Sequence, residues 1–145
     1  MPDFKYQTEI DELISNGCKL PSLSVPHNKF ACRYVFDHEH PNNHKPGYIQ
    51  NPKRVISDAD NNRLRISYYA LSCFEVEELA VQQFEDLKNT HKNIGDSIGN
   101  ALCSGFLEEE DGLITDSNKK TTHFDLYEYC ECDLGNKFEI KQRLI

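Results

Sequence analysis

Alternating hydrophobic and polar positions predict most of the strands of this chain. In residues 29–36 (KFACRYVF), Phe30, Cys32 and Tyr34 fall on one side, while Arg33 falls on the other. A period of two is typical of a strand within a sheet. Similar patterns and turn-forming residues elsewhere predict further extended segments. Strands are expected at residues 29–36, 54–56, 63–72, 103–107, 123–130 and 137–144.

The strongest helical pattern covers about residues 73–89. Ser72 and Glu75 have the spacing of a capping box, in which the serine side chain accepts a hydrogen bond from the Glu75 amide. Apolar residues then recur at helical spacing from Phe74 to Leu87. We therefore expect one long central helix over this stretch.

Shorter helices are expected on either side of it. Thr8 is a candidate cap for a helix that ends at Gly17, and residues 94–102 place apolar side chains on one helical face. Together with the strands, these elements predict an α+β fold with a mostly antiparallel sheet, the long helix and one or two shorter helices. The length of 145 residues predicts a single domain over residues 1–145.

The composition is acidic and polar. The net charge is -8 and the mean hydropathy is -0.67, yet eight Phe and seven Tyr supply the means to build a core. No apolar run has the length of a bilayer-crossing helix, and the first twenty residues lack the apolar segment of a signal peptide. We expect a cytoplasmic protein without membrane contact, in which the six cysteines are reduced thiols.

The charges are unevenly distributed along the chain. Residues 1–70 carry nine Lys or Arg against eight Asp or Glu, whereas residues 71–145 carry seven against sixteen. Because the acidic half repels phosphate backbones, binding of duplex nucleic acid is not expected. A local basic stretch from Lys45 to Arg65 is large enough for one phosphate group.

Residues 36–48 (FDHEHPNNHKPGY) contain three of the six histidines. Imidazole is a common zinc ligand, but Pro41 and Pro46 prevent the helical spacing that brings histidines together, and the spacing matches no metal motif. We therefore assign no metal, with zinc as the alternative. The loop is expected to be a solvated, turn-rich segment or, if the protein has a pocket, the polar rim of that pocket, where His38 or His44 contacts a ligand.

Arg33 is the most informative charged residue. Its neighbours on the same side of the predicted strand are Ala31 and Val35, and an arginine in apolar surroundings is costly unless it is paired or faces a ligand. It either pairs with a carboxylate, such as that of Asp125, or forms a fork for a phosphate or carboxylate. Further ligand-binding candidates are Lys53, Arg54, Ser67 and Tyr69. His123 or Glu110 is the candidate for transferring a proton or stabilising a developing charge.

The order of three residue types along the chain resembles that of the ADP-ribosyltransferase toxins. Arg33 comes first, then Ser67 or Ser72, then the pair Glu108-x-Glu110. The resemblance implies that the arginine holds the phosphates of a nicotinamide dinucleotide, the serine steadies the site and the last glutamate stabilises an oxocarbenium charge. The chain departs from that family, because ISYYALS replaces the S-T-S strand and 145 residues is short for that fold.

Two functions follow as hypotheses. The first is a small acidic protein that binds another protein, as an inhibitor, an antitoxin-like or immunity-like protein, or an accessory subunit. It follows from the acidic half, the tyrosine-rich strands and the absence of a complete catalytic motif. The second is a small transferase or nuclease that acts on a phosphate-bearing substrate. Convergence of Arg33, Ser67 and either His123 or Glu110 in one pocket would favour the second.

Overall fold

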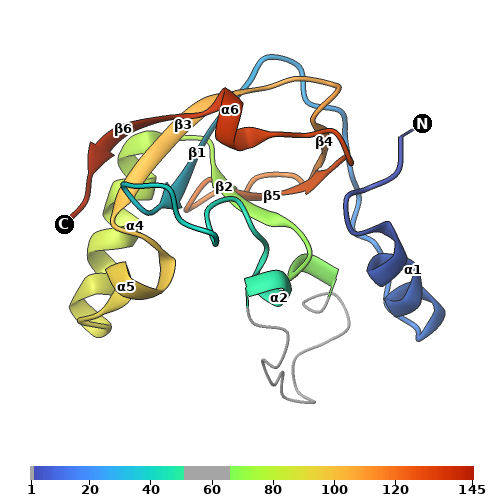
Figure 1. Ribbon diagram of the computed structural model, residues 1–145, viewed down its shortest axis with the longest axis horizontal. Coiled ribbons are helices and arrows are strands. Elements are labelled where there is room, and N and C mark those ends of the chain that lie inside the picture. The colour runs from blue at the N-terminus through green and yellow to red at the C-terminus, as the bar shows by residue number, and fades with distance from the viewer. Residues whose placement is uncertain (1, 51–65) are drawn as a thin grey trace.

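A six-stranded antiparallel sheet forms the centre of the fold, with the strand order β4-β5-β2-β1-β3-β6 (Figure 1). The structure is a computed structural model, and it describes residues 2–50 and 66–145. The α+β class and the antiparallel sheet expected from the sequence are confirmed. The strands are β1 (Lys29–Val35), β2 (Leu71–Phe74), β3 (Ala101–Leu107), β4 (Gly112–Ile114), β5 (His123–Glu128) and β6 (Glu139–Arg143).

Helices lie at both ends of the sheet (Figure 1). At one end α4 (Glu77–Thr90) packs Ala80 and Phe84 into the core, with α5 (Ile94–Ile98) beside it. At the other end α1 (Gln7–Ser15) buries Ile10. The short helix α2 (Gly47–Gln50) lies between the two ends. Within the described residues, no helix is both long and apolar enough to span a membrane.

The long helix begins four residues later than its sequence pattern predicts. The residues assigned to its first turn form β2, where Cys73 and Phe74 pair with Phe124 and His123 of β5. Burial of Cys73 and Phe74 outweighs the cap, because two apolar side chains contribute more than one capping hydrogen bond. The Glu75 amide donates to the carbonyl of Thr122 instead of to Ser72.

Other expectations also need correction. Residues 66–70, the middle of the strand expected at 63–72, form a helical turn, because the amides of Tyr69 and Ala70 donate back to the carbonyls three residues earlier. The helix expected over residues 94–102 ends at Ile98, because Ala101 and Leu102 pair with β1 at the start of β3. Thr8 lies inside α1 and provides no cap, although the helix does stop just before Gly17, which has φ 99°. The strand expected at residues 54–56 lies outside the described residues.

The two central strands pair much less extensively with each other than with their outer neighbours. β1 pairs with β3 from Lys29↔Leu107 to Val35↔Ala101. Between β1 and β2 the register consists of the single pair Cys32↔Phe74. The two strands therefore separate beyond Cys32, and Arg33 is the first residue of β1 past that pair.

α4 packs on one face of the sheet. The opposite face is covered by α6 (Leu134–Lys137) and the histidine-bearing loop. Leu134 and Phe138 join the core there, together with Val35, Cys73 and Cys103. All six cysteines are free thiols, and five are buried.

Candidate functional site

Arg33 occupies the place where β1 and β2 separate. Its NH1 group donates to the backbone carbonyl of Ser72 on β2, and its Nε donates to Nδ1 of His44 at 3.3 Å. The hydrogen bond to Ser72 takes the place of a backbone hydrogen bond that β1 and β2 would form there if their pairing continued. The arginine is thus held at two points by the fold, which restricts the orientation of its guanidinium group.

The charge of Arg33 is not balanced within the part of the chain that the structure describes. The residue is only 6% exposed, and none of the described carboxylates lies within 4.0 Å of its guanidinium. Burial raises the pKa of the Cys73 thiol to about 12, despite the opposing charge of Arg33, so this thiol stays neutral. Burial and then the charge of Arg33 lower the pKa of His44 to about 4, so His44 accepts as a neutral imidazole.

Arg33 lines a cavity of about 690 Å³, which we call the basic lobe. Its walls come from the end of β1, the loop before α2, residues 67–72, β5 and the helices α4 and α5. The chargeable side chains among its described lining residues are Arg33, Lys45 and His123, and no Asp or Glu is among them. Aromatic walls are supplied by Tyr34, Phe36, Tyr68 and Phe74.

A second cavity of about 460 Å³ adjoins the basic lobe, and we call it the hydroxyl lobe. The two lobes share Ser67, Tyr68, Ser72 and His123 as lining residues, so they form two parts of one cleft. His123 lies in the shared wall, where its Nε2 is 3.5 Å from Oδ1 of Asp125. This carboxylate can orient the imidazole for proton transfer.

The structure therefore brings together three of the residue types singled out in the sequence. Arg33, Ser67 and His123 line the same cleft, although their elements are far apart along the chain. Tyr69 does not line it, since its ring packs beside Tyr6 near α1. Lys53 and Arg54 lie outside the described residues.

Glu110 lies elsewhere in the fold. It is exposed in the turn after β3, where the neighbouring Glu108 accepts a hydrogen bond from the amide of Asn28. Asn28 directly precedes β1, and Lys29 and Arg33 are four residues apart along this strand, which corresponds to about 13 Å at roughly 3.3 Å per residue. The arrangement implied by the resemblance to the toxins, with Glu110 beside Arg33, is therefore not formed.

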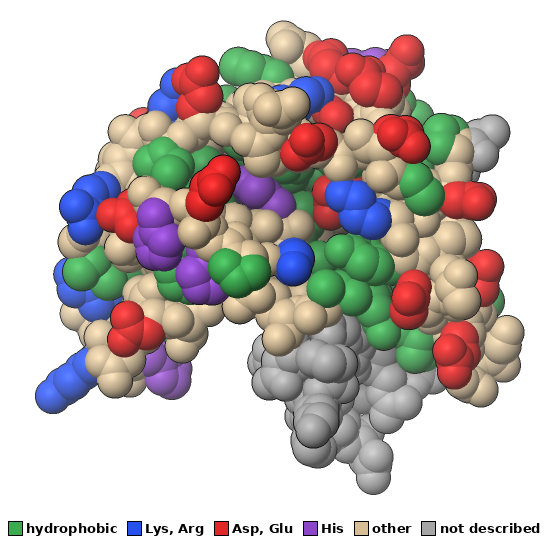
Figure 2. Space-filling view, viewed as in Figure 1, with side chains coloured by type: hydrophobic (Ala, Val, Ile, Leu, Met, Phe, Trp, Pro, Cys, Tyr) green, Lys and Arg blue, Asp and Glu red, His purple; other side chains and the backbone are tan. Residues whose placement is uncertain are grey.

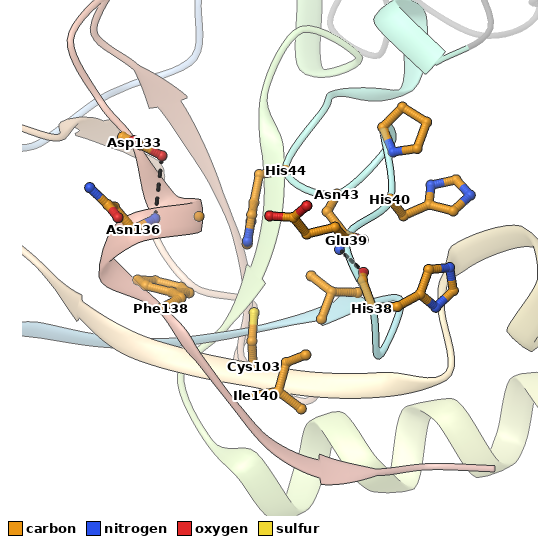
Figure 3. A pocket seen from close by; sticks show the side chains of 13 residues that line it. His38, Glu39, His40, Asn43, His44, Cys103, Asp133, Asn136, Phe138 and Ile140 are labelled. Carbon is orange, nitrogen blue, oxygen red and sulfur yellow. Dashed lines mark hydrogen bonds between the residues drawn. The ribbon is translucent and has the colours of Figure 1, made fainter.

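His38 and His40 extend to one side of the loop, and His44 extends to the other (Figure 3). The rings of His38 and His40 lie around Phe36, with centroids 6.1 Å and 4.0 Å from its ring. His44 points the other way, toward Phe138. Across residues 2–50 and 66–145, no group of three His, Cys, Asp or Glu side chains is arranged to hold a metal ion.

These side chains line a third, more open hollow of about 800 Å³ between the loop and α6. Figure 2 shows histidine side chains gathered on this face of the molecule. His38 contributes to this hollow and not to the basic lobe, and its Nδ1 lies 3.1 Å from Oδ1 of Asp37. His44 lines the hollow and bonds to Arg33, so their contact separates the hollow from the basic lobe.

Some features of the cleft have no signal in the sequence. The carbonyl of Ser72 becomes an acceptor for Arg33 only because β2 separates from β1 there. Tyr68 lines both lobes because residues 66–70 form a helical turn. The His123-x-Asp125 spacing was the one available signal, since alternate residues of a strand share a face.

Comparisons with protein-family models, curated proteins and solved structures give no match.

Proposed function

We propose that this protein binds a phosphate-bearing small molecule in the basic lobe and acts on it as a transferase or hydrolase. Arg33 is the anchor for the phosphate, Lys45 adds a second positive charge at the rim, and His123 is the group that transfers a proton. Ser67 supplies a hydroxyl in the same wall.

This proposal depends on one observation: the described residues supply no carboxylate within 4.0 Å of the buried guanidinium of Arg33. A buried guanidinium without a counter-charge is strongly unfavourable, by several kcal/mol in typical cases. A phosphate is the partner that the planar fork of arginine suits best. The absence of carboxylates from the described lining of the basic lobe supports the same conclusion, because the chain as a whole carries a net charge of -8.

Thermal unfolding in the presence of ligands tests the proposal. Pyrophosphate, AMP and nicotinamide dinucleotide are compared with adenosine, which lacks the phosphate. At a concentration roughly tenfold above Kd, a bound ligand should raise Tm by about 4 °C. Adenosine should give a much smaller rise.

Two lysine variants provide the control for this experiment. Lys45→Ala should weaken binding of the phosphate compounds about two- to fivefold, since one exposed charge is lost from the rim. Lys19→Ala removes a lysine that is also exposed but does not line the cleft, and it should leave the affinities unchanged. If none of the phosphate compounds raises Tm, or if both variants weaken them equally, the proposal is wrong.

Binding to another protein is the second candidate, and the edge strand β6 favours it. All five residues of β6 are exposed, and in the described part of the chain it pairs only with β3. Ile140 is 48% exposed on this strand, and Phe106 on β3 is 51% exposed. The outer edge of such a strand can form backbone hydrogen bonds with an extended segment of a partner protein.

Affinity purification tests this second candidate. The wild-type protein should retain one specific partner that an Ile140→Asp variant loses, provided that both proteins show the same circular dichroism spectrum. Retention of the partner by the variant, or the absence of any specific partner of the wild type, would exclude a role for this edge.

A further inference from the structure

We propose that the ligand of the cleft is a phosphate ester of a polyol, namely a sugar phosphate, either free or as part of a nucleotide. Its phosphate lies in the basic lobe and its hydroxyl groups lie in the hydroxyl lobe. This inference rests on the proposed function and adds the class of substrate to it.

The two lobes differ in a way that orients such a ligand. The described lining of the hydroxyl lobe includes two carboxylates, Asp116 and Asp125, and contains no Lys or Arg. The basic lobe has the opposite composition, with Arg33 and Lys45 and no described carboxylate. Among the described lining residues, the charges therefore favour a phosphate in the basic lobe over the hydroxyl lobe, so the two lobes suit different ends of a two-part ligand.

The hydroxyl lobe has the chemistry that recognises sugar hydroxyls. Its hydroxyl side chains belong to Ser67, Ser72, Thr115, Ser117 and the tyrosines at 68 and 127. A hydroxyl both donates and accepts, and an ionised carboxylate accepts two or more hydrogen bonds. The two aspartates can therefore accept from the sugar, while the serine and threonine side chains serve either role.

Tyr127 provides an independent observation in the same lobe. The residue is 1% exposed, and its hydroxyl oxygen has no hydrogen-bond partner among the described residues. Buried polar groups are almost always paired, and each exception calls for an explanation. A hydroxyl of a bound sugar would supply the missing partner.

His123 and Ser72 lie where the two parts of the ligand meet. Both residues line both lobes, and Ser72 lies opposite Asp125 in the pairing of β2 with β5. The linkage between phosphate and sugar would therefore pass beside the His123–Asp125 pair. This placement agrees with the proton-transfer role assigned to His123 above.

Equilibrium titrations followed by ³¹P NMR test the inference with three probes: inorganic phosphate, ribose 5-phosphate and AMP. Ribose 5-phosphate should bind roughly tenfold more tightly than inorganic phosphate, since two or more hydrogen bonds are added. AMP binding tighter than ribose 5-phosphate identifies a nucleotide as the source, and equal affinity identifies the sugar phosphate alone. Both results support the inference.

The variant Asp116→Asn separates recognition of the sugar from recognition of the phosphate. The variant should remove most of the affinity advantage, by which we mean the roughly tenfold higher affinity for ribose 5-phosphate than for inorganic phosphate. Inorganic phosphate itself should bind as tightly as before or more tightly, because a negative charge is lost. Glu109→Gln removes one exposed negative charge from a residue that lines neither lobe, and it should preserve the advantage. Tyr127→Phe should also reduce the advantage, without lowering the free energy of unfolding.

The inference and the proposed function fail in different ways. If ribose 5-phosphate and inorganic phosphate bind equally and both depend on Lys45, the inference is overturned and the proposed function stands. If Asp116→Asn and Glu109→Gln have the same effect on the advantage, the inference is also overturned. If none of the three probes binds, both are wrong.

Discussion

Arg33 donates a hydrogen bond from its Nε to Nδ1 of His44, over 3.3 Å. The bond connects the central strand β1 to the loop that carries three of the six histidines. It also places a neutral imidazole beside a buried cation, so His44 adds no second positive charge next to Arg33 at neutral pH. The pH dependence of stability should reveal this arrangement.

Protonation of His44 should destabilise the folded protein. Its pKa is about 4 in the folded state, against about 6.5 when unfolded, so between these values the unfolded chain binds the proton and the folded chain does not. Stability should therefore fall as the pH drops from about 6.5 to about 4, by up to about 3 kcal/mol. Urea unfolding at pH 7, 5.5 and 4.5 measures this dependence.

The variant His44→Asn isolates the contribution of this histidine. Asparagine retains an acceptor for Arg33 and tolerates the φ of 58° that His44 adopts, but it does not titrate. The variant should lose less stability than the wild type over the same pH range. Parallel pH profiles for the two proteins would mean that His44 is not the group responsible.

Arg33→Lys should reduce both stability and ligand binding. Lysine cannot reproduce the planar fork that donates to Ser72 and His44 together, so at least one charge-assisted bond is lost. Such a bond contributes about 1.5–3 kcal/mol. Chemical unfolding should show a loss in this range, and phosphate compounds should no longer raise Tm. A variant as stable as the wild type would contradict the assigned geometry.

The salt bridge between Lys5 and Glu128 should stabilise the attachment of the N-terminal segment to β5. Lys5 Nζ lies 2.9 Å from Oε2 of Glu128, whose side chain is only 3% exposed. Lys5→Met leaves this buried carboxylate without a cation and should cost about 3 kcal/mol. Lys141→Met, which removes the exposed bridge to Glu139, should cost less than about 1 kcal/mol. If urea unfolding shows the same loss in the free energy of unfolding for both variants, burial does not strengthen the bridge between Lys5 and Glu128.

Gly99 should tolerate no side chain. Its φ is 114°, and a Cβ atom there would lie 2.3 Å from the carbonyl oxygen of Val35. Gly99→Ala should cost about 3 kcal/mol or more, since both backbone strain and a backbone clash are introduced. Gly135 in α6 has room for a Cβ atom, so Gly135→Ala should cost less than about 1 kcal/mol. Similar melting temperatures for the two variants would refute the packing assigned to Gly99.

Alternating residue types predicted β1 and β5 in the expected places, and periodicity failed where tertiary packing decides. Burial follows this alternation only in the first half of β5, since Ala31, Cys32 and Arg33 of β1 are all buried. β2 has buried residues on both faces, and its sequence imitates the start of the next helix. The local sequence cannot show whether residues 71–74 begin a helix or form a strand, because the strand is stabilised by pairing with β5, which is distant in the sequence.

Sequence reasoning identified Arg33, Ser67 and His123 by their chemical types, but it could not bring them together. Their convergence depends on the strand order β5-β2-β1 and on the separation of β1 from β2, both of which are non-local. For the same reason the position of Glu110 was not predictable, since the antiparallel pairing of β3 with β1 carries it away from Arg33.

NMR spectroscopy during titration with pyrophosphate shows directly whether Arg33 and His123 bind phosphate together. The imidazole signals of His123 and the Nε–Hε signal of Arg33 are expected to shift together with a single Kd. The imidazole signals of His27 and His91, which do not line the cleft, should remain unchanged. Shifts confined to His38 and His40, or no shift of Arg33 and His123 at saturating pyrophosphate, would contradict the claim that these two residues form one phosphate-binding cleft.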